Sequence, residues 1–294
     1  MAQRVSRRRF LQASATSITA LSAAGAAAAD AADPARDTRT GAGRLKQSVC
    51  RWTLPGPLPK VCQRIKGLGL KGIDLLYPDE WPEARQSGLT CSMGYASRRE
   101  QFIEVGFNDP AQHAMLIEEL NTAIPLAAKA GVPNLIAMFG NRGGRSDAEG
   151  IANCVAGLTR VAPVAAAHGV TVCVELLNSK VDHPDYHGDR TAFGAAVMGQ
   201  VNSPYVRLLY DIYHMQIMEG DVIRTIREQR QWIGHFHTGG VPGRHEIDGS
   251  QELNYHAVAA AIADTGFTGY IAHEFKAQGE PYAALAAAYQ ICQV

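Results

Sequence analysis

The sequence lacks an excess of charge of either sign, because Lys plus Arg and Asp plus Glu both number 28 among its 294 residues. A protein that binds nucleic acid usually carries a basic surface, so the charge balance gives no support for such a partner. The sequence also lacks any CxxC spacing among its six cysteines. A domain of this size does not need disulfides, and we expect the cysteines to be buried free thiols.

A dinucleotide-binding fingerprint is missing as well, since no GxGxxG follows a strand-like segment. The loop GNRGGR at residues 140–145 is rich in glycine, but it has neither that spacing nor a phosphate-binding lysine. We interpret it as a flexible active-site loop or a plain connector. Outside the N-terminal region, we find no segment that reaches the ~20 apolar residues of a membrane span.

The N-terminal region carries the pattern of a targeting signal. Arg7 and Arg8 belong to the run SRRRFL, and an uncharged, alanine-rich stretch with small-residue cleavage sites follows. We therefore predict a Tat-type signal peptide at residues 1–32, a disordered linker at 33–44 and one catalytic domain at 45–294. The expected partner is the Tat export machinery, and the expected location is the periplasm, with no membrane span after cleavage.

The domain alternates strand-like and helix-like segments throughout its length. The expected strands are Leu45–Trp52, Gly72–Leu76, Leu89–Tyr95, Asn134–Phe139, Val170–Leu177, Val206–Met215, Ile233–His237 and Tyr270–Phe275. Helix patterns follow them, and the connections from helix to strand are short. About 250 residues in this order predict a single-domain α/β fold, a (β/α)8 TIM barrel. A doubly wound parallel sheet is the alternative.

Acidic or imidazole side chains stand near the C-terminal ends of four consecutive strands. They are Glu175, Asp211, His237 and Glu274. In a barrel these strand ends share one rim, so the four side chains can converge despite their distance in the sequence. Each residue alone has an ordinary structural role open to it, such as a turn cap for Asp211 or an ion pair with Arg244 for Glu274. The presence of one such residue on each of four consecutive strands favours a shared functional site over four separate structural roles.

Three carboxylates and one imidazole form an oxygen-rich ligand set. Carboxylates crowded in a dry place repel one another, and a divalent cation removes that cost. The set suits Mn²⁺ or Mg²⁺, with Zn²⁺, Co²⁺ or Fe²⁺ also possible. We therefore predict that Glu175, Asp211, His237 and Glu274 bind one divalent metal ion.

Several polar residues near these strand ends are candidates for substrate binding. His214 follows Asp211 by three residues, and Asn178 lies just beyond Glu175. Arg244, in the loop after the seventh strand, is placed to hold a carboxylate or hydroxyl group of a substrate. His235 is assigned to the core or to support of the site, and His183 and His187 receive no role.

The sequence around the four strand-end residues reads VELLN, YDIYHMQ, GHFHTGGVPGRHEID and AHEF, which contain Glu175, Asp211, His237 and Glu274. These motifs resemble the xylose-isomerase-like TIM-barrel superfamily, and within it the hydroxypyruvate isomerase and ketose 3-epimerase branch. The resemblance implies the same four metal ligands, with Glu175 and Glu274 also acting as acid and base. It further implies substrate contacts for His214 and Arg244.

The resemblance predicts an isomerase of a small α-hydroxy-carbonyl compound, with hydroxypyruvate converted to tartronate semialdehyde. Epimerases of the branch carry a further acid a few residues beyond the fifth-strand glutamate, where this chain reads SKVDH, so the isomerase is favoured. The competing functions are a ketose 3-epimerase, an inosose-type dehydratase on the same metal site, and a non-catalytic exported barrel that binds sugar acids. A homo-oligomer is compatible with the sequence.

Overall fold

The computed structural model describes residues 43–294. The predicted signal peptide and nearly all of the predicted linker lie outside the described residues. Arg44, at the end of that linker, already belongs to the folded domain, because its backbone N–H donates to the carbonyl oxygen of Val294 over 2.9 Å.

Eight short strands form one sheet. They are β1 (Lys46–Val49), β2 (Gly72–Leu76), β3 (Thr90–Gly94), β4 (Asn134–Met138), β5 (Thr171–Leu176), β6 (Val206–Asp211), β7 (Ile233–Thr238) and β8 (Tyr270–His273). The order in the sheet is β1-β8-β7-β6-β5-β4-β3-β2, and every paired strand is parallel to its neighbour. An isolated parallel bridge between Cys50 and Asp74 joins the β1 and β2 sides of the ring. The predicted TIM barrel is confirmed.

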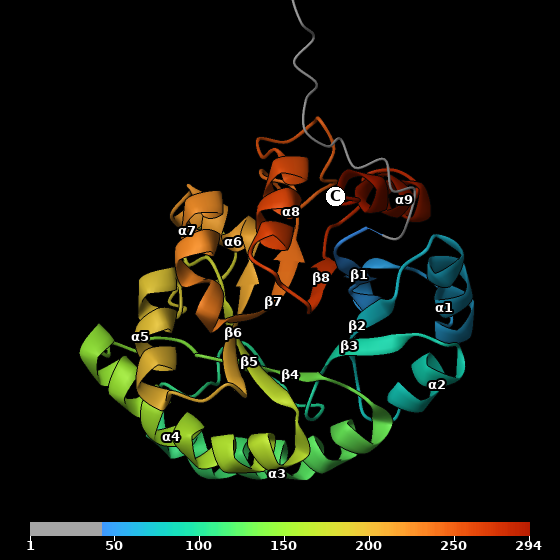
Figure 1. Cartoon of the computed structure of the whole chain (residues 1–294). Coiled ribbons are helices and arrows are strands. Elements are labelled where there is room, and N and C mark those ends of the chain that lie inside the picture. Colours follow the sequence, from blue (N-terminus) through green and yellow to red (C-terminus); the bar gives the residue numbers. More distant parts are fainter. Residues whose placement is uncertain (1–42) are drawn as a thin grey trace, which may run out of the picture. The chain divides into compact units, whose positions relative to one another are not determined.

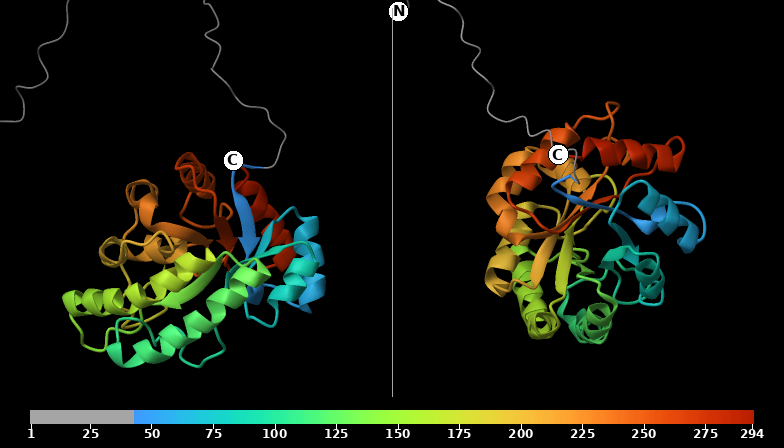
Figure 2. Two further views of the ribbon diagram at one scale, coloured as in Figure 1. Left: turned by 60° about the horizontal axis from the view of Figure 1, so that its bottom comes forward. Right: turned by 45° about the vertical axis from the view of Figure 1, so that its right-hand side comes forward.

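The helices surround the strands (Figures 1 and 2). They are α1 (Leu58–Gly67), α2 (Trp81–Gln86), α3 (His113–Ala130), α4 (Asp147–His168), α5 (Thr191–Val201), α6 (Ile212–Met218), α7 (Val222–Gln229), α8 (Tyr255–Asp264) and α9 (Pro281–Ile291), with 3₁₀ turns η1 (Arg51–Thr53), η2 (Pro110–Gln112) and η3 (Arg230–Trp232). Most expected elements recur with small changes at their ends, as is usual for frayed termini.

One strand is shorter than the sequence predicts. The stretch Val206–Met215 is a strand only as far as Asp211, and the short helix α6 begins at Ile212. The reason is local, because the Asp211 carboxylate accepts a hydrogen bond from the backbone N–H of His214 and so caps the new helix. His214 is therefore presented from the first turn of a helix rather than from a strand.

Helix α4 shows how the outer layer is attached to the barrel. Ser146 and Glu149 form a reciprocal capping box at its start. By length and composition α4 is apolar enough to cross a membrane. However, its side chains Cys154, Leu158 and Val161 are fully buried in the core, so this apolar stripe is accounted for by packing on the barrel.

The barrel interior contains many polar side chains. Its buried polar residues include Ser48, Asp74, Ser92, Asn134 and His235. These groups bond to one another, as when His235 Nε2 lies 2.6 Å from Asp74 Oδ2. Gln47 and His273 are buried on the outer face of the sheet, where Gln47 bonds to His273 and to the backbone carbonyl of Tyr289 on α9. Buried polar groups are tolerated when they are paired in this way. The six cysteines are free and buried, as predicted.

Candidate active site

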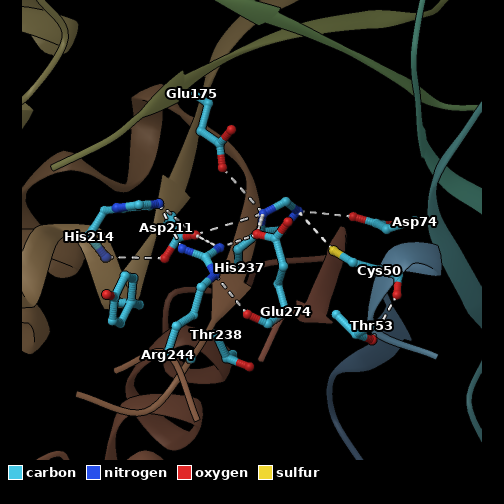
Figure 3. Close-up of polar contacts among 12 residues, drawn as sticks. Cys50, Thr53, Asp74, Glu175, Asp211, His214, His237, Thr238, Arg244 and Glu274 are labelled. Carbon is cyan, nitrogen blue, oxygen red and sulfur yellow. Dashed lines mark hydrogen bonds and ion pairs between the residues drawn. The ribbon is translucent and has the colours of Figure 1, made fainter. Parts of the chain in front are cut away.

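The four predicted ligands meet at the C-terminal rim of the barrel. One ligand atom from each of Glu175, Asp211, His237 and Glu274 lies within 4.8 Å of the corresponding atom of the others. His237 Nδ1 is the centre of the group, at 2.7 Å from Glu274 Oε2, 3.3 Å from Glu175 Oε1 and 3.9 Å from Asp211 Oδ2 (Figure 3). Register explains part of this convergence, because Asp211 on β6 pairs with His237 on β7.

The structure gives a reason, independent of the sequence, to expect a divalent metal ion at these residues. Among the described residues, the buried Nδ1 atom of His237 has no hydrogen-bond partner with acceptable geometry. It faces three carboxylates, and the donor set of three oxygen groups and one imidazole nitrogen suits Mn²⁺ or Mg²⁺. Burial alone would lower the pKa of His237, but the charge of Glu274 helps to raise it well above its ordinary value. The cluster therefore attracts positive charge, which a divalent ion would supply.

The two glutamates have different electrostatic surroundings. Burial raises the pKa of Glu175 to about 7, against the opposing influence of His237. Burial also acts to raise the pKa of Glu274, but Arg244 and His237 hold it well below its usual range. Two carboxyl groups whose pKa values are moved apart can serve as proton donor and proton acceptor.

Arg244 closes the cluster from the loop after β7. Its Nη2 atom donates to Asp211 Oδ2 over 2.6 Å and also to Glu274 Oε2, while Nε donates to the backbone carbonyl of Glu274. Its Nη1 atom lies 2.7 Å from His214 Nε2. Burial and the nearby Arg244 cation hold the pKa of His214 well below its ordinary value, so the His214 ring is neutral.

A cavity of about 370 Å³ opens over this cluster. Its apolar and aromatic lining residues are Trp52, Leu75, Tyr95, Phe102, Ile103, Ile136, Met138 and Leu177. Its polar lining residues are Glu175, Asp182, His183, His214, Arg244, Glu274 and Lys276. The predicted substrate contacts His214 and Arg244 thus line the cavity.

Asn178 lies behind the cavity wall. Its side-chain amide donates to Asp182 Oδ2 over 2.6 Å, and its carbonyl oxygen accepts from the backbone N–H groups of Val181 and Asp182. The side chain is fully buried. Asn178 therefore holds the loop after β5, and the predicted contact with substrate stays a prediction.

The cavity residues that the sequence did not predict include Trp52, Asp182, His183 and Lys276. Trp52 Nε1 donates to Glu274 Oε1 over 2.8 Å and so orients that carboxylate. Trp52 and Lys276 each follow a strand by a few residues, and this position is the signal that could have identified them. Asp182 and His183 end the segment SKVDH, a few residues beyond Glu175, and this position after the fifth strand is the signal that could have identified them.

Comparison with known proteins decides the family. The profile described as "Xylose isomerase-like TIM barrel" matches residues 68–291, which is more than half of the chain. The chain belongs to this family. A Homo sapiens protein named "Putative hydroxypyruvate isomerase" is 28% identical over 244 residues, which span 78% of this chain and 88% of the human protein.

One further sequence relative and one solved structure are also similar to this chain. A "2-oxo-tetronate isomerase" of Cupriavidus necator is 38% identical over 119 residues, covering 40% of this chain and 45% of that protein. Among solved structures, "AP endonuclease, family 2 from Brucella melitensis" has a TM-score of 0.72 at 24% identity, covering 83% of this chain and 98% of that one. At that identity the structural likeness shows the fold alone. The chain is an enzyme of an isomerase and epimerase family.

Proposed function

We propose that the protein is a metal-dependent isomerase that converts hydroxypyruvate to tartronate semialdehyde. The observation that carries the proposal is the convergence of Glu175, Asp211, His237 and Glu274 on one point beneath the cavity. Relatives named hydroxypyruvate isomerase and 2-oxo-tetronate isomerase support the reaction class.

The four converging residues would hold one divalent ion, Mn²⁺ or Mg²⁺, with Zn²⁺, Co²⁺ and Fe²⁺ also compatible with the donor set. When bound, such an ion polarises the substrate carbonyl and stabilises negative charge on the adjacent oxygens. His237 would serve as a ligand through Nδ1, the atom that lacks a hydrogen-bond partner among the described residues.

The glutamates move the proton. In hydroxypyruvate the ionised Glu274 takes a proton from the hydroxymethyl carbon, and the electron pair enters the neighbouring carbonyl to give an enediolate. Glu175, with its pKa of about 7, supplies a proton to the former carbonyl carbon. The hydroxyl group of the substrate gives its proton to Glu175, which is thereby reprotonated, and the oxygen of that hydroxyl becomes the aldehyde oxygen. The proton held by Glu274 passes to the former carbonyl oxygen, which becomes the new hydroxyl, and both glutamates are restored.

Two cations can hold the substrate carboxylate. Arg244 is already bonded to Asp211 and Glu274, which fixes its position at the cavity wall. Lys276 lines the same cavity, and no ion pair of its ammonium group is found within residues 43–294. We assign the carboxylate of the substrate to Arg244 and Lys276 together. In a Lys276→Met variant we expect KM to rise about tenfold with a smaller change in kcat.

Deuterium exchange tests the reaction. The purified protein is loaded with Mn²⁺ and incubated with hydroxypyruvate in D₂O, and the products are followed by NMR after the metal is removed. We expect tartronate semialdehyde with deuterium on the hydroxyl-bearing carbon. If the metal-loaded protein causes neither exchange nor product formation with hydroxypyruvate, the proposed substrate is wrong.

A ketose 3-epimerase is the second candidate, and Asp182 favours it. The sequence favours the isomerase because SKVDH stands where an epimerase carries its further acid after Glu175. Asp182, seven residues beyond Glu175, nevertheless lines the cavity and is held by Asn178 and by the Tyr213 hydroxyl, which donates to Asp182 Oδ2 over 2.8 Å. A panel of ketoses in the same D₂O assay separates the two activities. Exchange at C3 of a ketose, without exchange in hydroxypyruvate, favours the epimerase.

An inosose-type dehydratase and a non-catalytic barrel give different results in the same experiment. The dehydratase would eliminate water and form an unsaturated or dicarbonyl product. The non-catalytic exported barrel would bind sugar acids without any exchange, in the presence or absence of metal.

We also propose that the protein is exported by the Tat machinery, on the basis of Arg7 and Arg8 in SRRRFL. In a Tat-competent bacterium, replacing both arginines by lysine is expected to keep the protein in the cytoplasm. Cell fractionation measures this, and periplasmic recovery of the double variant would contradict the proposal.

A further inference from the structure

Asp74 is a buried acid that the proposed reaction does not use. It lies on β2, is fully buried in the barrel, and is separated from His237 by 163 residues in the sequence. Figure 3 shows it on the side of His237 opposite to Glu175. A carboxylate in such a place is costly unless every oxygen is hydrogen-bonded.

Four polar hydrogens surround this carboxylate. Oδ1 accepts from the hydroxyl groups of Ser48, at 3.2 Å, and Ser92. Oδ2 lies 2.6 Å from His235 Nε2 and 3.1 Å from His237 Nε2. An ionised carboxylate offers about four acceptor positions, so the contacts to Ser48, Ser92, His235 and His237 use all of them.

The contact with His237 decides which nitrogen of that ring is available. Asp74 is an acceptor, so the ring must carry its hydrogen on Nε2. A histidine that ligates a metal ion is neutral. In that form of His237, Nδ1 has a free lone pair, and this atom faces Glu175, Asp211 and Glu274. Histidine ligands of metal ions commonly donate their other N–H to a carboxylate, which fixes both the tautomer and the ring orientation.

A second metal ion among Asp74, His235 and His237 is the competing interpretation, since their ligand atoms are close enough together. The hydrogen bonds argue against it. Ser48 and Ser92 already donate to one oxygen, and the remaining oxygen is at hydrogen-bond distance from both rings. All three side chains are also fully buried in the barrel interior, beneath the cavity that gives access to the rim.

We infer that Asp74 is a positioning residue that holds His237 in the Nε2–H tautomer with Nδ1 turned toward the metal ligands. The inference rests on the metal site of the proposed function. It concerns the affinity of the apo-protein for metal and does not depend on which substrate is used. Asp74 thus acts through His237 and makes no contact with substrate.

Direct metal binding tests the inference. The dissociation constant for Mn²⁺ is measured from the electron paramagnetic resonance signal of free Mn²⁺ for the wild type, Asp74→Asn and Ser48→Ala. We expect the Asp74→Asn variant to bind Mn²⁺ about 10- to 100-fold more weakly. Ser48→Ala is the matched control, because it removes a donor to the same carboxylate without touching His237. Its dissociation constant is expected to stay within about threefold of the wild-type value.

A double-mutant cycle separates positioning from general loss of structure. Gln at position 237 could still ligate through its side-chain oxygen but has no tautomer for Asp74 to fix. We therefore expect Asp74→Asn to have less than about a threefold effect on Mn²⁺ binding in a His237→Gln background. An equal effect in both backgrounds would overturn the inference, because Asp74 would then act only on the stability of the barrel.

The wild-type protein provides a test that does not depend on folding of the variants. Nitrogen-15 spectra of histidine-labelled, Mg²⁺-loaded protein report the tautomer of each ring, and the His237→Gln spectrum identifies the resonance. We expect hydrogen on Nε2, and hydrogen on Nδ1 would refute the inference. If the wild type binds neither Mn²⁺ nor Mg²⁺, the proposed metal site fails first. If the wild type and Asp74→Asn bind Mn²⁺ equally tightly, only the inference fails.

Discussion

Arg244 Nη2 lies 2.6 Å from Asp211 Oδ2, and the same nitrogen bonds to Glu274 Oε2. The guanidinium group therefore shares two carboxylates with the predicted metal site. The other oxygen of Asp211, Oδ1, caps helix α6 by accepting a hydrogen bond from the backbone N–H of His214. One loop arginine thus links the ligand cluster to the cavity wall.

This linkage predicts a large effect of a conservative change at Arg244. Lysine keeps the charge but cannot bond to Asp211, Glu274 and His214 together. We expect kcat/KM of the Arg244→Lys variant to fall about 100-fold, as a displaced substrate anchor requires. Arg207→Lys, near the opposite end of the barrel, is the matched control, and steady-state kinetics measures both. A loss below about threefold for Arg244→Lys would contradict the role given to it.

The glutamates are predicted to be essential for turnover. Glutamine has nearly the same shape but cannot accept or donate the transferred proton, so Glu175→Gln and Glu274→Gln should each lower kcat by at least about 1,000-fold. Glu228→Gln on exposed α7 serves as the control. Circular dichroism and thermal unfolding verify that each variant is folded. Near-normal turnover in either rim variant would remove that residue from the mechanism.

Metal removal is expected to abolish activity and to lower stability. The carboxylates of the rim repel one another when no divalent ion is present. Dialysis against EDTA should stop turnover, and Mn²⁺ or Mg²⁺ should restore it. At about 100 times its dissociation constant, a metal that binds only the folded state adds about 2.7 kcal/mol to the free energy of unfolding. Unchanged activity after EDTA would contradict the metal dependence. No activity with or without metal, together with an unchanged melting temperature, would favour the non-catalytic binding barrel.

His273 is predicted to make the fold sensitive to acid. Burial lowers its pKa from 6.5 to about 4, and the neutral ring is bonded to Thr238 and Gln47. Between these two pKa values the unfolded chain binds a proton that the folded protein does not, so stability is lost as the pH falls. From about pH 7.5 to about pH 5 this group should remove about 2 kcal/mol from the free energy of unfolding.

Urea unfolding at both pH values measures this loss. In His273→Gln the difference in unfolding free energy between the two pH values should shrink by about that amount. His256→Gln is the control, because His256 lies on the exposed side of α8. An equal acid sensitivity in the wild type and His273→Gln would show that different groups are responsible.

The order of elements and the four converging residues could be predicted because they follow simple rules. Apolar segments of strand length alternate with helix patterns, and parallel strands of a barrel place their C-terminal ends on one rim. Glu175, Asp211, His237 and Glu274 each stand at such an end. Their convergence therefore follows from the barrel topology, and the alternation of strands and helices in the sequence is enough to predict that topology.

The remaining parts of the site depend on geometry that no local pattern carries. Asp74 sits inside an apolar strand, and its role emerges only when β2 and β7 are placed in one barrel. The break between Asp211 and Ile212 depends on a single capping hydrogen bond. Asp182 reaches the cavity because Asn178 and Tyr213 hold its loop. Each of these contacts joins residues through tertiary structure rather than periodicity.

The bond from Trp52 to Glu274 has a practical consequence. The Trp52 side chain is 46% exposed and lines the cavity, whereas Trp81 is 2% exposed and Trp232 lies before β7 at the opposite end of the barrel. Indole fluorescence depends on contact with water and on the charge nearby. A molecule that enters the site covers Trp52 and alters the carboxylate to which it is bonded. The protein therefore contains its own optical reporter of occupancy, readable with ligands that are never turned over.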